Sequence, residues 1–278
     1  GWIAAAIIGT FVVARGEDGW RWGLALGAVP AVYAIVVRLG LPESVRFLES
    51  RGRHDEAEAT VQSFEAQTTP EHYDTAPATA PETVHGGIWG PTLRGRTLSF
   101  WIVWFCVSLA YYGAFIWIPS LLVAQGFTLV KSFTFTLIIT IAQLPGYAAA
   151  AWLIEVWGRR KTLAGFLAGS AVSAVLYGLA SAEWQIIAAG CMLSFFNLGA
   201  WGALYAIGPE LYPTAVRATG TGAGAAFGRI GSIIAPLIVP LLLDFRGPIA
   251  VFSVFAAAFA IACVAAFTLP EQRGRALN

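Results

Sequence analysis

Long apolar stretches alternate with short polar ones along most of the chain. Seven of the apolar stretches contain 19 to 26 residues each, and none shows the strict alternation of polar and apolar positions typical of a barrel strand. About 20 helical residues cross a hydrocarbon core about 30 Å thick, and a helix bonds all of its backbone polar groups internally. We therefore predict seven membrane-spanning helices, at residues 22–41, 98–122, 133–156, 162–180, 184–207, 218–243 and 248–269.

A shorter apolar segment opens the chain. Residues 1–14 are too few to span a bilayer, and they include no starting Met, basic region or cleavage site typical of a signal peptide. We expect them to be the end of a helix that is truncated at the N-terminus. The predicted fold class is therefore an all-α integral membrane protein with one partial and seven complete transmembrane helices.

Composition agrees with a membrane location and excludes several functions. Hydrophobic residues make up 57% of the chain and charged residues 12%, with a mean hydropathy of +0.68, whereas soluble domains carry about 25% charge. A net charge of +1 gives no reason to expect a nucleic-acid partner. The three cysteines lie in apolar segments and the three histidines in one polar stretch, so we expect no disulfide framework, metal site or cofactor. Without an HExxH or GxSxG motif, or a His, Asp or Glu well inside a span, we expect no enzyme activity.

Basic residues indicate the orientation in the membrane. If the predicted spans alternate in direction, twelve of the 17 Lys and Arg residues fall on one side, four on the other, and Arg229 inside a span. By the positive-inside rule, the side with twelve is cytoplasmic. We therefore expect a multi-pass protein of the cell (plasma or inner) membrane, with the long loop at residues 42–96 and the C-terminus in the cytoplasm.

A long polar insert divides the chain. Residues 54–67 place Ala57, Val61 and Phe64 on one helical face, which predicts a short amphipathic surface helix. Residues 68–90 are rich in Thr, Pro, Ala, Gly and Glu, which predicts a disordered linker. The predicted organisation is therefore the last two helices of a first bundle at residues 1–41, a cytoplasmic loop at 42–96, a six-helix bundle at 97–270 and a cytoplasmic tail at 271–278.

Four short motifs stand at the predicted cytoplasmic ends of spans. They are LPESVR at residues 41–46, GRRK at 158–161, PELYPTAVR at 209–217 and LPEQRGR at 269–275. In this order and at this face they resemble the motifs of major facilitator superfamily transporters, with the chain matching helices five to twelve. Val45 and Val156 depart from that pattern, which often has a proline and an arginine there. The resemblance implies that further N-terminal helices of the same protein precede residue 1.

Opposite charges gather in these motifs, where the resemblance implies a cytoplasmic gate. Ion pairs between two bundles would hold the cytoplasmic side shut and separate during alternating access. The alternative is that these residues are topology anchors and solvated surface charges, whose exposed pairs contribute only about 0–1 kcal/mol each. The candidate gating residues are Glu43, Arg46, Glu155, Arg159, Arg160, Glu210, Arg217, Glu271 and Arg275.

One arginine lies deep inside a predicted span. Arg229 is 11 residues into the 26-residue segment 218–243, which is about 17 Å along a helix and near the bilayer midplane. A cation there costs roughly 2.5–3.5 kcal/mol, so it requires a partner or a water-filled cavity. A guanidinium pairs bidentately with a carboxylate and stays charged at physiological pH, which favours an anion site. The alternative is a structural arginine bonded to carbonyls or to an acid, including an acid from helices outside this chain.

Polar and aromatic residues concentrate in three other spans. Asn197, Trp201 and Tyr205 repeat every four residues and therefore share one helical face. They predict a cavity lining, for which the alternatives are ordinary core or interfacial aromatics and, for the amides, interhelical hydrogen bonds. Residues 248–269 have almost no polarity on any face, and we expect them to be exposed to lipid. The candidate substrate-binding residues are Arg229, Asn197, Trp201, Tyr205, Gln143, Tyr111, Tyr112 and Trp117.

Small residues recur just before Arg229. Gly220, Gly224 and Gly228 are spaced by four and followed by Ser232, a pattern that predicts close packing against another helix. A nucleotide-binding loop is the alternative, but no strand precedes these glycines and no P-loop lysine follows them. We therefore expect a packing stripe, with Arg229 on the neighbouring face towards a cavity.

The stretch around Arg229 also resembles niacin transporters and aromatic acid:proton symporters, and is similar to organic anion transporters, which carry an arginine here. The resemblance implies transport of a small aromatic monocarboxylate such as nicotinate or a benzoate, with proton symport. No titratable group lies convincingly at membrane depth in this chain, so we expect the proton carrier in the preceding helices. The alternatives are a sugar porter, which shares the exit motifs, and a non-transporting receptor on the same fold. The expected partners are the lipid bilayer, a small organic anion and protons.

Overall fold

A computed structural model of the chain describes residues 2–15, 18–40, 43, 45, 48, 51–65 and 86–271. Every regular element within these residues is a helix, as the predicted all-α class requires. The elements form two compact units, Gly1–Gly16 with Pro81–Asn278 and Glu17–Ala80, which are described separately.

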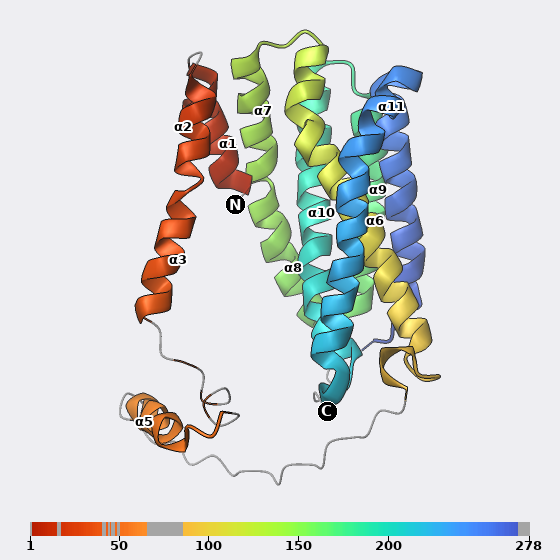
Figure 1. Ribbon diagram of the computed structural model, residues 1–278. Coiled ribbons are helices and arrows are strands. Elements are labelled where there is room, and N and C mark those ends of the chain that lie inside the picture. Colours follow the sequence, from red (N-terminus) through yellow and green to blue (C-terminus); the bar gives the residue numbers. More distant parts are fainter. Residues whose placement is uncertain are drawn as a thin grey trace. The chain divides into compact units, whose positions relative to one another are not determined.

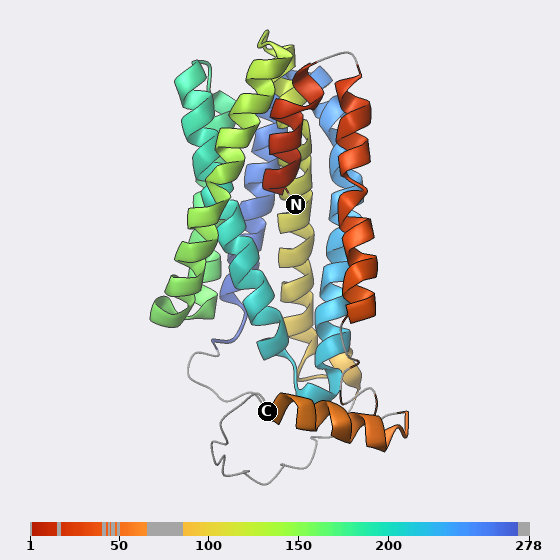
Figure 2. The same ribbon diagram turned by 90° about the vertical axis from the view of Figure 1, so that its left-hand side faces the viewer.

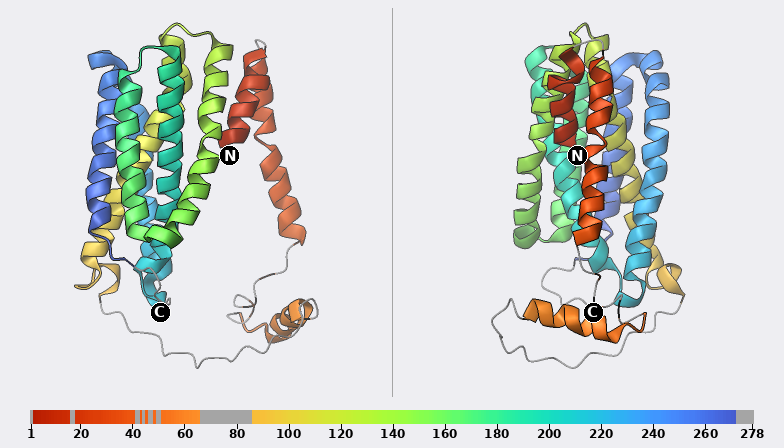
Figure 3. Two further views of the ribbon diagram at one scale, coloured as in Figure 1. Left: turned by 180° about the vertical axis from the view of Figure 1, so that it is seen from behind. Right: turned by 60° about the vertical axis from the view of Figure 1, so that its left-hand side comes forward.

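The larger unit is a bundle of long helices that stand side by side (Figures 1 and 3). Its helices are α1 (Trp2–Phe11), α6 (Arg94–Ala124), α7 (Leu129–Ile141), α8 (Gln143–Trp157), α9 (Arg159–Leu179), α10 (Glu183–Leu211) and α11 (Arg217–Phe267). Within the described residues, six helical stretches are long and apolar enough to cross a membrane: Gly19–Leu39, Arg94–Val123, Leu129–Trp157, Arg159–Leu179, Glu183–Leu211 and Ala215–Phe267. Because the last stretch contains two crossings, these six account for the seven predicted spans.

The longest helix, α11, consists of two arms joined by a sharp reversal. Arg246 and Gly247 leave helical geometry, and the dihedral angles of Gly247 (φ 66°, ψ −157°) are essentially available only to glycine. Pro248 then begins the second arm, where its missing N–H and fixed φ suit the first turn of a helix. The arms, at residues 217–245 and 248–267, run in opposite directions beside each other (Figure 1, light and dark blue).

The smaller unit contains α2 (Gly19–Leu26), α3 (Val29–Gly40) and α5 (His54–Glu65). α5 is the amphipathic helix predicted at residues 54–67, with Ala57 buried and Phe64 56% exposed. The predicted linker lies mostly outside the described residues, and its described end forms a 3₁₀ turn at Gly87–Trp89.

Prolines interrupt two of the predicted spans. α8 follows α7 after a single residue, where Pro145 has no N–H to donate to the carbonyl of Ile141. α3 follows α2 after two residues, where Pro30 in the same way leaves the carbonyl of Leu26 without its helical donor. Each of these spans, predicted as one helix, is therefore two helices end to end (Figure 2, red, for α2 and α3).

Close contact between α6 and the first arm of α11 lies at the centre of the larger unit. Gly224 and Gly228 of the predicted stripe are buried against α6, where a Cβ would lie 2.6 Å from Phe100 and 2.9 Å from Ser108. Gly220 is also buried, but its Cβ would lie 2.6 Å from Tyr212, the C-cap of α10. At Gly231 a Cβ would lie 2.6 Å from the carbonyl oxygen of Phe105, so here the two backbones meet directly. The stripe residues are Gly220, Gly224 and Gly228.

The second arm of α11 buries one face and exposes the other. Phe252, Phe255 and Phe259 are fully buried in the core, whereas Ile261 and Val264 are 55% and 69% exposed. The expectation of lipid exposure at residues 248–269 therefore holds for one face only. An all-apolar helix gives no sign of which face packs, because lipid and protein core accept the same side chains.

The short helix α1 packs against α7. Gly9 allows the ring of Phe133 to approach within 2.6 Å of where a Cβ would stand, and the Thr10 hydroxyl donates to the Phe133 carbonyl at 3.2 Å. Trp2 meets the Tyr111 ring edge-on at 5.6 Å between centroids. The assignment of residues 1–41 to a separate bundle stays a prediction, as do the boundaries at residues 96 and 270.

We expect Gly231→Ala to lower the free energy of unfolding by about 1–3 kcal/mol, because its Cβ meets backbone atoms that cannot move aside alone. The matched control is Gly222→Ala, where a Cβ meets nothing within 4 Å and alanine has the better helix propensity. Denaturant titration of the purified protein measures both values. Equal effects at the two positions would contradict direct backbone contact between α6 and α11.

Candidate functional site

Four aromatic residues predicted to line a cavity lie together on α6 and α10. The ring centroids of Tyr111 and Tyr112 are 5.2 Å apart, and Tyr111 also meets Trp201 at 5.7 Å. Trp201 stacks on Tyr205 at 5.6 Å with 28° between the rings. The stacking follows from their one-turn spacing on α10, whereas the contact with Tyr111 depends on how the two helices pack.

Arg229, on the first arm of α11, lies against this group. Its Nη1 donates a hydrogen bond of 2.9 Å to the Tyr112 hydroxyl, and its Cζ is 5.9 Å from the centroid of the Tyr112 ring. No carboxylate pairs with Arg229 among the residues that the structure describes. A guanidinium has five N–H donors, so one bond to a phenol leaves most of its binding capacity unused.

Further aromatic residues in this region were not predicted. Trp2 and Phe115 lie 5.6 and 4.9 Å from Tyr111 between ring centroids. Trp104 lies 5.3 Å from Trp201 between ring centroids, and Tyr147 lies near Tyr111. Spacing contained a signal for the last two. Trp104 is two turns before Tyr111 on α6, and Tyr147 is one turn after Gln143 on α8.

The other three predicted residues take different places. Gln143 is 5% exposed, and its side chain interacts with the nearby Tyr111 hydroxyl. Its Nε2 nevertheless makes no hydrogen bond of standard geometry in the described chain. Asn197 is fully buried, and neither polar atom of its amide has a partner within the same residues. Trp117 makes no ring contact with these side chains in the described chain, since it stands roughly 140° around α6 from Tyr112.

We refer to Tyr111, Tyr112, Gln143, Tyr147, Trp201, Tyr205 and Arg229 as the Arg229 cluster. Its members come from α6, α8, α10 and α11. We call its three buried members (Tyr111, Gln143 and Trp201) the floor and its other four members, which are half-buried or exposed, the rim. Two apolar grooves elsewhere, of about 320 and 450 Å³, include none of these residues. The cluster combines a cation, hydrogen-bond donors and aromatic rings, which suits an anion that carries an aromatic ring.

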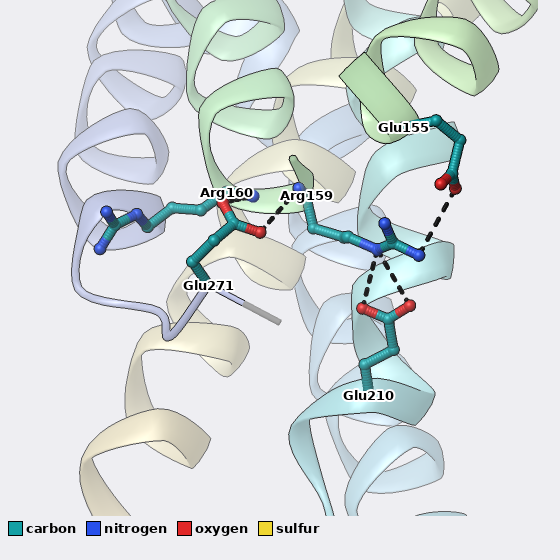
Figure 4. A network of polar contacts seen from close by, with 5 residues as sticks. All are labelled: Glu155, Arg159, Arg160, Glu210 and Glu271. Carbon is teal, nitrogen blue, oxygen red and sulfur yellow. Dashed lines mark hydrogen bonds and ion pairs between the residues drawn. The ribbon is translucent and has the colours of Figure 1, made fainter. Parts of the chain in front are cut away.

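A second polar site lies where α8, α9 and α10 end or begin, around Arg159 (Figure 4). Arg159 Nε donates to both carboxylate oxygens of Glu210, at 3.0 and 3.1 Å, and its Nη2 is 3.5 Å from Glu155. The side chains of Arg159 and Glu210 are each 18% exposed, whereas that of Glu155 is 71% exposed. The Arg159–Glu210 pair is therefore the better shielded of the two.

Glu271 joins the end of α11 to the start of α9. Its carboxylate accepts hydrogen bonds from the backbone N–H groups of Arg159 and Arg160, at 3.0 and 3.2 Å. These groups begin α9 and have no partner within the helix, so a carboxylate here caps the helix and complements its dipole. The preceding Gly158 has φ +89°, and a Cβ there would lie 2.8 Å from the Glu271 carboxyl. Glycine meets both requirements, because it adopts a positive φ without strain and has no Cβ to collide with the carboxylate.

The other candidate gating residues give no test of pairing between two bundles. Arg160 meets Glu271 through its backbone N–H, while its side chain points away from Arg159 and Glu210 (Figure 4). Arg217 Nε donates to the Tyr212 carbonyl at 3.3 Å. Glu43 is exposed and belongs to the smaller unit. Arg46 and Arg275 lie outside the described residues.

Comparison with known families identifies this architecture. The family described as "Sugar (and other) transporter" matches residues 1–278. The chain belongs to this transporter family. A structure of the xylose transporter XylE from E. coli, in a partially occluded inward-open conformation, aligns with a TM-score of 0.70 and 16% identity over 99% of this chain and 62% of that one. XylE is described as a major facilitator superfamily protein, so the predicted superfamily fold is confirmed.

Two curated proteins are more similar to this chain in sequence. The niacin transporter NiaP of Acinetobacter baylyi is 42% identical over 284 residues, which cover 100% of this chain and 64% of the relative. A Bacillus subtilis protein whose name also refers to niacin and nicotinamide transport is 42% identical over 267 residues, covering 95% of this chain and 60% of that protein. The chain therefore spans less than two thirds of the length of these relatives.

Double-mutant cycles should separate the two ion pairs of Arg159. We expect a coupling energy of about 1–2 kcal/mol between Arg159 and Glu210, because the pair is shielded and doubly hydrogen-bonded. The coupling between Arg159 and the exposed Glu155 should stay below about 0.5 kcal/mol. Free energies of unfolding of the single and double alanine variants give both values. A larger coupling to Glu155 would contradict the burial argument.

Proposed function

We propose that the protein containing this chain is a secondary active transporter that moves a small aromatic monocarboxylate, such as nicotinate or a benzoate, by alternating access. The observation that carries the proposal is Arg229, a cation inside a membrane-spanning helix whose contact in the Arg229 cluster is a neutral phenol. Such a charge requires a counter-charge or water. A substrate carboxylate supplies the counter-charge and can accept two N–H groups of the guanidinium at once.

The aromatic rings of the Arg229 cluster support an aromatic substrate. Tyr112, Tyr147 and Tyr205 form the rim together with Arg229, and aromatic pairs attract one another at centroid distances of about 4.5–7 Å. A planar acid held by its carboxylate would therefore lie against aromatic side chains. The names of the two niacin-related relatives point to the same class of substrate.

The Arg159 network supports a gate at the end of the bundle that the basic residues assign to the cytoplasm. Its contacts tie α8, α9, α10 and the end of α11 together, so in this proposal these ends move as one body during alternating access. Proton symport belongs to the same proposal. The carboxylates of the described spans, Glu155, Glu183, Glu210 and Asp244, lie at or near helix ends, so we assign the proton carrier to another part of the protein.

A sugar is the second candidate substrate. The buried amides of Gln143 and Asn197 favour it, because amides both donate to and accept from hydroxyl groups. Arg229 disfavours it, because a neutral polyol leaves the cation without a counter-charge. Competition between xylose and an aromatic acid for transport distinguishes the two.

Replacing Arg229 should remove transport of the acid. In liposomes containing the full-length protein, we expect Arg229→Ala to reduce uptake of labelled nicotinate or benzoate at least about 100-fold. The reason is that the substrate carboxylate loses its charged hydrogen bonds to the guanidinium, and no other cation in the described chain lies beside Tyr112 to replace it. Arg229→Lys should retain only part of the activity, since an ammonium cannot pair bidentately.

The matched control for this experiment is Arg246→Ala, which removes a solvent-exposed arginine from the reversal of the same helix α11. Its uptake should equal that of the unmodified protein. Unchanged uptake in both Arg229 variants would remove Arg229 from the site, and preferential transport of xylose would favour the sugar candidate.

Replacing Arg159 should slow transport without abolishing substrate binding. Arg159→Ala breaks the contacts with Glu210 and Glu155. Arg159 begins α9, next to the end of α8 that is far from Gln143, so we expect the Arg229 cluster to stay intact. We expect the maximal uptake rate to fall about tenfold, with the dissociation constant of the acid changed less than about twofold. Lys161→Ala, on an exposed neighbour, is the control. Specific binding without flux in the unmodified protein would instead favour a receptor.

A further inference from the structure

The floor of the Arg229 cluster contains two hydrogen-bond donors without a partner in the described chain. They are Nε2 of Gln143 and Nε1 of Trp201, on side chains that are 5% and 6% exposed. An amide nitrogen and an indole nitrogen donate but do not accept. Buried donors are nearly always paired in folded proteins, because an unpaired one loses its bonds to water without replacement. An acceptor on a bound molecule would meet this requirement.

The contacts of the cluster connect Gln143 to Arg229. Arg229 bonds to the Tyr112 hydroxyl, the ring of Tyr112 lies 5.2 Å from that of Tyr111, and the hydroxyl of Tyr111 lies beside Gln143. Tyr147 follows one turn after Gln143 on the same face of α8 and is 44% exposed. A continuous set of side chains therefore leads from the cation at the rim to the amide in the floor. A molecule held by a carboxylate at Arg229 would extend along these rings towards Gln143.

We propose that Gln143 determines specificity by donating from Nε2 to an acceptor in the aromatic ring of the substrate, so that the site prefers a pyridine carboxylate to a benzoate. This inference rests on the proposed function and decides between the two acids that it leaves open. A pyridine nitrogen carries a lone pair in the ring plane and accepts a hydrogen bond at neutral pH. The C–H group in the same place in benzoate cannot accept, and it leaves Nε2 buried and unpaired.

The two acids form a matched pair for the experiment. Nicotinate and benzoate have the same shape and the same carboxylate, so a difference in affinity reports on the ring nitrogen. We expect the unmodified full-length protein in liposomes to bind nicotinate about tenfold more tightly than benzoate, as measured by competition against labelled nicotinate. Gln143→Met keeps the length of the side chain but has no N–H donor. This substitution should lower the affinity for nicotinate about tenfold and change the affinity for benzoate by less than about twofold. The ratio of the two affinities should then fall to about one.

The control variant is Gln125→Met, which makes the same chemical change at the exposed C-cap of α6 and should alter neither affinity. An equal loss of affinity for both acids in Gln143→Met would overturn the inference. It would mean that Gln143 supports the fold around Tyr111 and does not donate a hydrogen bond to the ring nitrogen. The ratio of the nicotinate and benzoate affinities in the unmodified protein tests the inference even if Gln143→Met does not fold. Transport of both acids without preference overturns it and leaves the proposed function standing, whereas uptake of neither acid overturns the proposed function.

Discussion

The close approach of α6 and the first arm of α11 is the contact on which the Arg229 cluster depends. At Gly228 a Cβ would lie 2.9 Å from the Ser108 hydroxyl. Arg229 follows directly after this glycine, and Tyr112 stands one helical turn after Ser108. The contact between the two backbones therefore brings a guanidinium and a phenol from segments 117 residues apart within hydrogen-bonding distance. Lipid provides no hydrophobic force between helices, so glycines that allow backbones to touch have a large effect on such a pairing.

The side chains of the cluster provide a cation and hydrogen-bond donors, and the proposed preference for an anion follows from this. Arg229 provides a cation, Gln143 and Trp201 provide N–H donors, and no described carboxylate is paired with the cation. In a medium of low dielectric constant each of these groups is costly when unpaired. An acceptor-rich anion with an aromatic ring meets all of them at once, whereas a neutral polyol does not.

The Arg159 network differs from the cluster because its charges are already paired within the chain. Arg159 and Glu210 shield each other, and Glu271 occupies the N-terminal N–H groups of α9. The positive φ of Gly158 lets the chain turn from α8 into α9 while the carboxylate approaches closely. These contacts make one end of the bundle a single unit, whereas in the Arg229 cluster the buried donors of Gln143 and Trp201 have no partner in the described chain.

The sequence by itself determined the membrane spans, because the thickness of the bilayer sets how many apolar residues a helix needs. It also determined that Arg229 lies well inside a span and that Trp201 stacks on Tyr205, since both follow from the rise and turn of a single helix. The partner of Arg229, the places of Trp104 and Tyr147, and the absence of Trp117 from the ring contacts of the cluster came only from the tertiary structure. An aromatic residue in an apolar span has the same sequence signature whether it faces a cavity, the core or lipid, as the 65% exposed Trp152 illustrates. Only the packing of helices distant in sequence decides among these, because it sets which faces meet.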